Sequence, residues 1–443
     1  MGTTRRSFLE TSATAAAFTI VPRHVLGKGH QAPSDTVDVA AIGVGGMGRN
    51  DVRGMAQAGA NIVALCDVDD DAAADAYRSY PQARRYKDFR ELIERERNVT
   101  AILVSTPDHA HTAATLLALR AGKHVRTQKP LTRTIAEARA VREAAAQRPR
   151  LVTQMGNQGN AGDGVRLLRE WVEAGTIGAV REIHYWTNRP IWPQALLRPT
   201  DAHNPRPSLD WNLWLGPAPE RPYSPAYAPF RWRGWWDFGT GALGDIACHA
   251  MDAAYWILNL GYPSRIEAEC SELFAETAPR TSRITFTFPE RGNRPAVTVV
   301  WRDGSLTAPR PPEWPATDQW PFASDGGQLW VGDQGKLVAG IYADNPRLLN
   351  RERMVELTAR PLEQRYPRIE GGVYAEFVRA IQGGGRCGSD FRDHASGLTE
   401  MVLIGCLAQR QGGVIEIDPA SGRIITNVPA DWVTPQYRRG WTL

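Results

Sequence analysis

Short apolar runs alternate with amphipathic stretches over the first third of the chain. The apolar runs predict strands at residues 37–42, 61–66, 100–105, 123–127 and 150–155. Helical spacing of apolar residues follows the first strand, at Val52, Met55 and Ala56, and further helices are predicted near 70–77, 89–93 and 108–119. Strands that alternate with helices in this way predict a parallel sheet covered by helices, which is a doubly wound α/β fold.

The pattern changes after residue 157. Strands are predicted at 266–270, 283–288, 296–301, 328–331 and 336–339, and helices at 374–381 and 394–409. Because few helices separate these strands, we expect an open, largely antiparallel sheet in a second, α+β domain. Residues 186–256 hold eight of the 15 tryptophans. Such aromatic residues stack on sugar rings, and they equally well form a packed irregular loop region.

A glycine-rich loop follows the first predicted strand and contains Gly43, Gly45, Gly46, Met47 and Gly48. In a strand–loop–helix unit these glycines allow a tight turn and close approach of a dinucleotide pyrophosphate. Asp67 ends the second strand, 19 positions after Gly48, which suits a carboxylate that binds the adenosine ribose. Asp67 and the acids at 69–71 would repel a 2′-phosphate, so NAD is predicted rather than NADP. The alternative is the same sheet with an empty crevice.

The chain is long enough for two domains. We predict a signal peptide at 1–30, an NAD(P)-binding Rossmann domain at 36–157 and a substrate-binding α/β domain at 158–443. Arg5 and Arg6 precede a weakly apolar segment, which is typical of a twin-arginine export signal and predicts a periplasmic protein. A chance arginine pair in a disordered N-terminus, and hence a cytoplasmic protein, is the alternative.

Composition narrows the function classes. The chain is 23% charged and 42% hydrophobic, as in ordinary globular proteins. The first 29 residues carry +3 of the net charge of +4, so no nucleic-acid partner is expected. No stretch approaches 18 apolar residues, so no membrane span is expected. The five cysteines lack C-x-x-C spacing, and neither a metal site nor a disulfide framework is predicted.

Two strand ends carry candidate chemistry, because ligands of doubly wound sheets bind at the carboxyl ends of the strands. The first is the turn Thr106-Pro107-Asp108-His109, and the second is Gln128-Lys129-Pro130. An ammonium at Lys129 could stabilise a developing alkoxide. His109 could equally cap a helix or pack in the core, and Lys129 could equally lie on the surface.

A third candidate is the helix that begins near residue 241. Asp245 and His249 stand four residues apart and therefore share one helix face. A carboxylate can orient and tune an imidazole that acts as a base. An exposed helix face with a local hydrogen bond is the other interpretation.

Taken together, these motifs resemble the Gfo/Idh/MocA oxidoreductases. The resemblance implies a Rossmann domain with NAD or NADP, a second domain whose sheet often forms homo-oligomers, and hydride transfer at a secondary alcohol of a sugar or cyclitol. It implies catalytic roles for Lys129, Asp245 and His249. The implied cofactor site comprises the glycine loop with Asp67, Thr106, Pro107, His109, Gln128 and Lys129, and the implied substrate site comprises Asn157, Trp236, Asp245 and His249. Gln128 departs from the family's E-K-P pattern and removes a charge beside Lys129.

The preferred function is NAD(P)-dependent oxidation or reduction of a small carbohydrate, with a tightly bound cofactor. Free cofactor is scarce in the periplasm, so a redox-neutral glycosidase, lyase or epimerase that uses NAD transiently is the alternative within enzymes. A non-catalytic sugar or nucleotide sensor on the same fold is the alternative from another class.

Overall fold

The computed structural model describes residues 36–443 except 202, 316, 319, 321–325, 442 and 443. The predicted signal peptide lies outside these residues. Residues 37–443 form one compact unit. In the part of the chain that the structure describes, no helix combines the length and apolar character needed to cross a bilayer.

The first sheet has six parallel strands in the order β3-β2-β1-β4-β5-β6. Its strands are β1 (Asp38–Ile42), β2 (Asn61–Cys66), β3 (Arg84–Tyr86), β4 (Ala101–Val104), β5 (His124–Thr127) and β6 (Thr153–Met155). The helices between them are α2 (Gly46–Gln57), α3 (Asp70–Ser79), α4 (Phe89–Arg95), α5 (Asp108–Arg120) and α6 (Ile135–Ala146). This order confirms the predicted doubly wound Rossmann sheet.

The second sheet has eight strands in the order β13-β12-β11-β7-β10-β9-β8-β14. They are β7 (Val180–Thr187), β8 (Arg265–Cys270), β9 (Ser282–Phe288), β10 (Val297–Arg302), β11 (Gly326–Gly332), β12 (Gly335–Gly340), β13 (Arg347–Leu348) and β14 (Gly413–Glu416). Only β7 and β10 pair in parallel among the described strands of this sheet, which confirms the predicted open and largely antiparallel arrangement.

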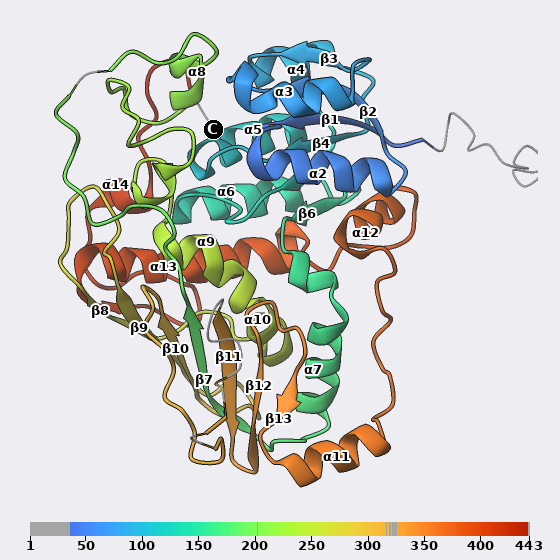
Figure 1. The fold of residues 1–443 in the computed structure, drawn as a ribbon, viewed down its shortest axis with the longest axis vertical. Helices are drawn as coiled ribbons and strands as arrows, with labels where there is room; N and C mark the ends of the chain where they lie inside the picture. Colours follow the sequence, from blue (N-terminus) through green and yellow to red (C-terminus); the bar gives the residue numbers. More distant parts are fainter. Residues whose placement is uncertain (1–35, 202, 316, 319, 321–325, 442–443) are drawn as a thin grey trace, which may run out of the picture. The chain divides into compact units, whose positions relative to one another are not determined.

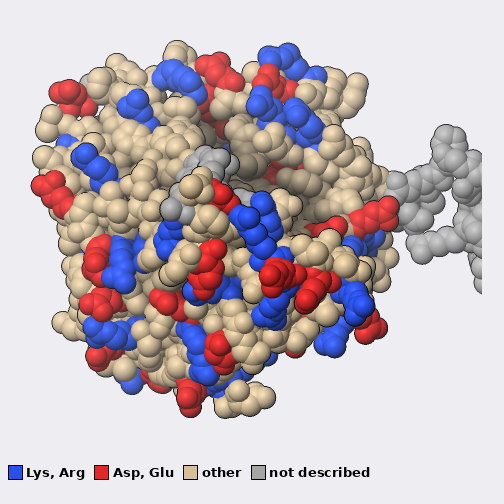
Figure 2. Space-filling view, turned by 60° about the horizontal axis from the view of Figure 1, so that its bottom comes forward, with Lys and Arg blue, Asp and Glu red and all other residues tan. Residues whose placement is uncertain are grey.

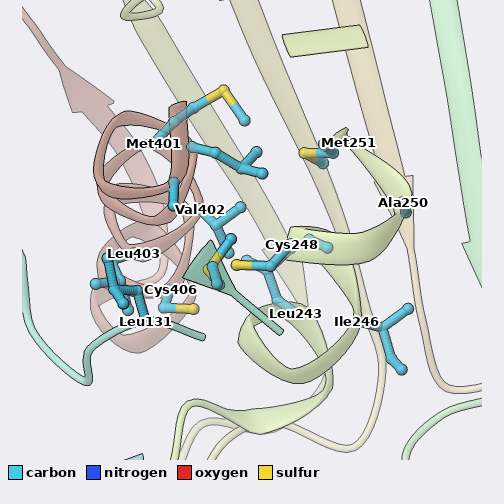
Figure 3. Close-up of a cluster of buried hydrophobic side chains, with 14 of the residues drawn as sticks. Leu131, Leu243, Ile246, Cys248, Ala250, Met251, Met401, Val402, Leu403 and Cys406 are labelled. Carbon is cyan, nitrogen blue, oxygen red and sulfur yellow. The ribbon is translucent and has the colours of Figure 1, made fainter. Parts of the chain in front are cut away.

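The remaining helices follow the first sheet in the sequence, and two of them lie in the segment between β7 and the helix that begins at Gly241. They are η3 (Gln158–Ala161), α7 (Asp163–Glu173), α8 (Trp211–Leu215), η4 (Arg231–Gly234), α9 (Gly241–Ala250), α10 (Asp252–Leu258), α11 (Arg351–Ala359), α12 (Gly372–Ile381), η5 (Phe391–Ala395), α13 (Ser396–Gln411) and α14 (Ala430–Val433). Figure 1 shows α9 and α13 crossing between the two sheets. Helix α13 contacts α6 on one side and β8 on the other, and it is buried from Ser396 to Gln409. Its contact with α9 is built from apolar side chains such as Leu243, Met401 and Val402 (Figure 3).

The tryptophan-rich segment is an irregular insert between β7 and α9. Most of its aromatic side chains are buried against one another, as in the stacked pair Trp211 and Trp214 and the edge contact of Trp214 with Phe238. The insert therefore has a small apolar core of its own. On the face shown in Figure 2, basic and acidic side chains are interspersed rather than gathered by sign.

Candidate active site

The glycine loop between β1 and α2 leaves space and donors for an anion. Gly43 has φ +77°, and a Cβ there would lie 2.8 Å from the Ser105 backbone. A Cβ at Gly48 would lie 1.8 Å from the Gly43 carbonyl oxygen. Helix α2 has no side-chain cap and no acid in its first turn, so its first N–H groups are free to bind phosphate oxygens. The loop residues thus fit a dinucleotide pyrophosphate.

Asp67 holds this loop from the end of β2. Its Oδ2 accepts hydrogen bonds from the N–H groups of Val44 at 2.8 Å and Gly45 at 3.1 Å, and its Oδ1 accepts one from Asp69 at 3.0 Å. Burial raises the pKa of the Asp67 carboxyl, and the backbone donors oppose that rise. The exposed Met47 lies at the turn into α2. Asp67 therefore ties the end of β2 to the glycine loop, and its contact with the adenosine ribose stays a prediction.

A strap from the insert, residues 206–210, crosses the segment that follows Asp67. Arg206 forms an ion pair with the buried Asp69. The backbones pair as well, since Asp70 N–H donates to Ser208 O at 3.1 Å and Asp210 N–H donates to Val68 O at 2.9 Å. The strap thus attaches the insert to the edge of the Rossmann sheet beside Asp67, although the two segments lie far apart in the sequence.

Lys129 and Asp245 come from distant segments of the chain and form a mostly buried ion pair. Lys129 follows β5, and Asp245 lies in the second turn of α9. The ammonium donates hydrogen bonds to Asp245 Oδ1 and to the Asp245 carbonyl oxygen, both at 2.8 Å. Arg233 Nε lies 3.5 Å from the same Oδ1. Burial acts to raise the pKa of Asp245, but Lys129 and Arg233 hold it below its usual value. Asp245 is therefore a carboxylate at neutral pH.

His249 lies one turn beyond Asp245 on α9. Its side chain is buried, its Nδ1 has no hydrogen-bond partner among the described residues, and its ring packs on Tyr342 with centroids 4.9 Å apart. Burial, and then the Lys129 charge, lower the pKa of His249 to about 3, while Asp245 opposes the shift. The imidazole is therefore neutral across the physiological pH range.

Asp108 belongs to the same cluster, although the sequence analysis did not assign it a role. It is buried at the start of α5 and accepts a hydrogen bond from Thr240 Oγ1 at 2.9 Å. Burial, followed by the charge of Asp245, raises the pKa of Asp108 to about 7. Its position directly after Pro107 at a strand end was the signal that could have identified it.

The neighbouring residues of this turn are built into the core. The His109 ring nitrogens face the carbonyl oxygens of Trp214 at 2.9 Å and Phe238 at 3.3 Å, so the structure places His109 in the apolar core of the insert. Burial lowers its pKa to about 4. Thr106 Oγ1 is buried without a partner among the described residues, and Pro107 forms the N-cap of α5.

Gln128 lies next to the buried carboxylate of Asp51, which explains why an amide stands at this position. Its Nε2 donates to both oxygens of Asp51, at 2.8 and 3.0 Å, and its Oε1 accepts the Lys129 N–H at 3.3 Å. Asp51 also accepts from Ser105 Oγ and Tyr374 OH. A glutamate at position 128 would set two buried carboxylates against each other, so the amide is the side chain that suits this surrounding.

The remaining two candidates lie on either side of α9. Asn157 is buried, donates to Asp252 Oδ1 at 2.9 Å and leaves its own Oδ1 without a partner among the described residues. Asp252 also contacts His394 Nε2 at 2.6 Å. Trp236 lies in the loop before α9, beside Arg133. Within the described part of the chain, no group of three or more His, Cys, Asp or Glu side chains is arranged to hold a metal ion.

Comparisons with known proteins agree with this geometry. The family model described as "Oxidoreductase family, NAD-binding Rossmann fold" matches residues 37–155, and the model described as "Oxidoreductase family, C-terminal alpha/beta domain" matches residues 191–294. Together these segments cover about half of the chain.

Two curated relatives match parts of the chain. The inositol 2-dehydrogenase/D-chiro-inositol 3-dehydrogenase of Lacticaseibacillus casei is 33% identical over 146 residues, which is 32% of this chain and 42% of that protein. The levoglucosan dehydrogenase of Pseudarthrobacter phenanthrenivorans is 25% identical over 194 residues, which is 44% of this chain and 42% of that protein. The chain thus matches less than half the length of either relative.

A solved structure matches over a longer range. The WlbA dehydrogenase from Bordetella pertussis, in complex with NADH and UDP-GlcNAcA, aligns with a TM-score of 0.59 and 17% identity, covering 86% of this chain and 99% of that one. This likeness shows that the whole two-sheet fold is shared. Because the family models match segments in both parts of the fold, the chain belongs to the Gfo/Idh/MocA oxidoreductase family, with its NAD-binding Rossmann domain.

Proposed function

We propose that the chain is an NAD-dependent oxidoreductase that transfers hydride at a secondary alcohol of a sugar, glycoside or cyclitol and holds its nucleotide tightly. The names of the inositol and levoglucosan dehydrogenases support this substrate class. The observation that carries the proposal is the pairing of Lys129 with Asp245, one helical turn from His249, at the carboxyl ends of the Rossmann strands.

These side chains have complementary tasks. Bound NAD would supply the hydride acceptor. The neutral His249 ring would accept the hydroxyl proton of the substrate, and Lys129 Nζ would donate a hydrogen bond to the same oxygen as negative charge develops. Asp245 fixes the position of the lysine through two hydrogen bonds. Gln128 would fix the backbone at Lys129 without adding a second negative charge.

The strap supports the proposal of tight nucleotide binding. Residues 206–210 are attached beside Asp67 by an ion pair and two backbone hydrogen bonds, so a fixed segment lies next to the carboxylate that we propose binds the adenosine ribose. A retained nucleotide must be reoxidised by a second substrate before another turnover. We therefore propose a closed cycle in which one carbohydrate is oxidised and another carbonyl compound is reduced.

Single-turnover reduction tests this function directly. The nucleotide that co-purifies with the full chain is identified by mass, and the protein is then mixed with a panel of sugars, glycosides and cyclitols while absorbance is followed near 340 nm, where reduced nicotinamide absorbs. We expect one equivalent of reduction with at least one compound, and loss of the signal when a ketose or aldose acceptor is added. No reduction with any compound, from a protein that binds NAD, would favour the sensor function instead.

A redox-neutral elimination or epimerisation is the second candidate, and Asp108 favours it. Such reactions need a further proton transfer next to the oxidised carbon, and Asp108 is a carboxyl group with a pKa of about 7 beside Lys129 and Asp245. A substrate that is converted with no lasting change at 340 nm, and that exchanges a carbon-bound proton with deuterated water, would identify this reaction.

A further inference from the structure

A small cavity lies behind the candidate active site, between the start of α6, the loop before α9, and helices α13 and α14. Its volume is about 30 Å³, and its lining includes Arg133, Trp236, Thr240, Arg410 and Trp432. A volume of this size holds roughly two water molecules or one small oxyanion. The cavity is separate from the Lys129–Asp245 pair, and no role is assigned to it by the family comparisons.

The lining carries two arginines that form no ion pair among the described residues. Arg133 donates one hydrogen bond, from Nη1 to the Trp236 carbonyl oxygen at 2.8 Å, and its Nε is buried without a partner. Arg410 Nε is also buried without a partner. The Arg410 guanidinium stacks on the Trp432 ring at 4.3 Å, a contact that uses its face and leaves its in-plane N–H groups free.

A third unpartnered donor comes from Trp236. This side chain is only 6% exposed, and its indole Nε1 has no hydrogen-bond partner among the described residues. A buried donor without an acceptor is unfavourable, and an acceptor bound in the cavity would relieve that cost. Three lining side chains with orphaned donors, two of them cationic, therefore share one cavity.

The surrounding carboxylates do not neutralise this charge directly. Asp237 and Glu276 act on the Arg410 charge from a distance, and both accept hydrogen bonds from Arg221 instead. Burial lowers the pKa of Arg410 to about 10, and Arg133 adds to that effect while Asp237 and Asp431 oppose it. Two like charges in one partly buried lining are stabilised best by an anion between them.

We propose that this cavity binds a small oxyanion, either phosphate or a carboxylate, through Arg133, Arg410 and the Trp236 indole. Planar guanidinium groups and an N–H donor match the several oxygens that both anions present. Thr240 lines the same cavity and donates a hydrogen bond to Asp108. A bound anion would therefore also stabilise the loop that contains Thr240 and leads into α9.

The test uses the full chain saturated with NAD, so that the glycine loop cannot take the anion. Calorimetric titrations with inorganic phosphate and, separately, with acetate are run at constant ionic strength, and melting temperatures are recorded in both. We expect saturable binding of one equivalent of at least one anion, with a higher melting temperature. Tighter phosphate binding would identify a phosphate site, and tighter acetate binding a carboxylate site.

The variants assign the binding to this cavity. Arg410→Gln and Arg133→Gln should each weaken binding at least about tenfold, the loss expected of a charge-assisted hydrogen bond. Trp236→Phe, which keeps a ring and removes the donor, should weaken it less. Arg351→Gln, at an exposed arginine of α11, should leave it unchanged. If an arginine variant does not fold, the anion affinity of Arg410→Lys is measured instead, and this variant should also bind more weakly than the wild type. Absence of saturable binding of both anions, or unchanged affinity in the folded variants, would overturn the proposal.

Discussion

Lys129 Nζ donates two hydrogen bonds to one residue, Asp245, through the carboxylate and through the main-chain carbonyl oxygen. An ammonium has three donors, so one N–H remains for a substrate oxygen. In the proposed mechanism this N–H would donate to the reacting oxygen, and the neutral His249 would be the base.

The first prediction concerns these catalytic groups. Lys129→Ala and His249→Ala should each slow single-turnover reduction of bound NAD by about 10²- to 10⁴-fold, because each removes a group that acts on the reacting hydroxyl. Asp245→Asn should fall between them and the wild type. All three should retain nucleotide, as measured by mass after gel filtration.

The matched control is Lys336→Ala, which removes a lysine of the second sheet that pairs with Glu313. It should reduce NAD at the wild-type rate. A wild-type rate in His249→Ala would show that another group is the base, and Asp108 would be the next candidate.

Asp108 makes stability depend on pH in a predictable direction. Its pKa is raised to about 7 in the folded protein, so the folded state binds this proton more tightly than the unfolded state. Its contribution is complete below pH ~4 and is lost as the pH rises to about 7. Asn does not titrate, so the free energy of unfolding of Asp108→Asn should not fall in this way. It should therefore rise relative to that of the wild type between pH 5 and pH 8.

Urea unfolding at several pH values measures this difference. Asp393→Asn, at an exposed position of η5, serves as the control and should show no comparable change with pH. A constant difference between Asp108→Asn and wild type over the whole range would contradict the assignment.

Gln128 should be intolerant of glutamate despite the family pattern. Gln128→Glu would replace two hydrogen bonds to Asp51 with repulsion between buried carboxylates, at a cost of about 1–3 kcal/mol in the free energy of unfolding. Adding Asp51→Asn should restore most of that loss, since the pair would again be an amide and a carboxylate.

Thermal and urea unfolding of the single and double variants measure the coupling. Gln334→Glu, at an exposed turn, should be close to neutral. If the double variant were as unstable as the sum of the two single variants, Asp51 would not be the reason for the amide.

NAD should bind more tightly than NADP to the nucleotide-free protein. Asp67 and a 2′-phosphate a few ångströms apart would repel each other by about 1–4 kcal/mol, which is roughly fivefold or more in affinity. The nearby Arg206 is engaged by Asp69 and does not offset this repulsion. Parallel titrations measure the preference, and Asp67→Asn should narrow it. Tighter binding of NADP to the wild type would disprove it.

Export remains a prediction from Arg5 and Arg6, which lie outside the described residues. Replacing both with lysine should leave folded, nucleotide-loaded protein in the cytoplasm, because the twin-arginine signal is read by its receptor. Cell fractionation measures this result. An unchanged periplasmic yield would mean that the leader has been misread.

The strands that could be predicted are those whose burial produces a continuous apolar run in the sequence. The central strands of the Rossmann sheet are continuous apolar runs, since both of their faces are covered. Strand β3 was missed because it is a short edge strand, and its Arg84 and Arg85 are exposed. Strand β7 was missed because its apolar residues are mixed with polar ones and lead into the insert, although it lies at the centre of the second sheet.

The site residues that could be predicted are those whose motif lies within one short segment of the sequence. The glycine loop, and the spacing of Asp245 and His249, can be seen within a few residues. The partners that tune these groups come from distant segments. Asp51 lies 77 positions from Gln128, and Arg206 lies 137 positions from Asp69, so only the folded chain brings them together.

Helix α13 has a consequence for motion. It is buried on all sides, between α6 of the first sheet and β8 of the second, and its apolar residues leave no solvated face along which it could slide. Hinge bending between the two sheets would have to open this packed interface. We therefore expect the slow motions of the molecule to belong to the insert and its strap rather than to the two sheets.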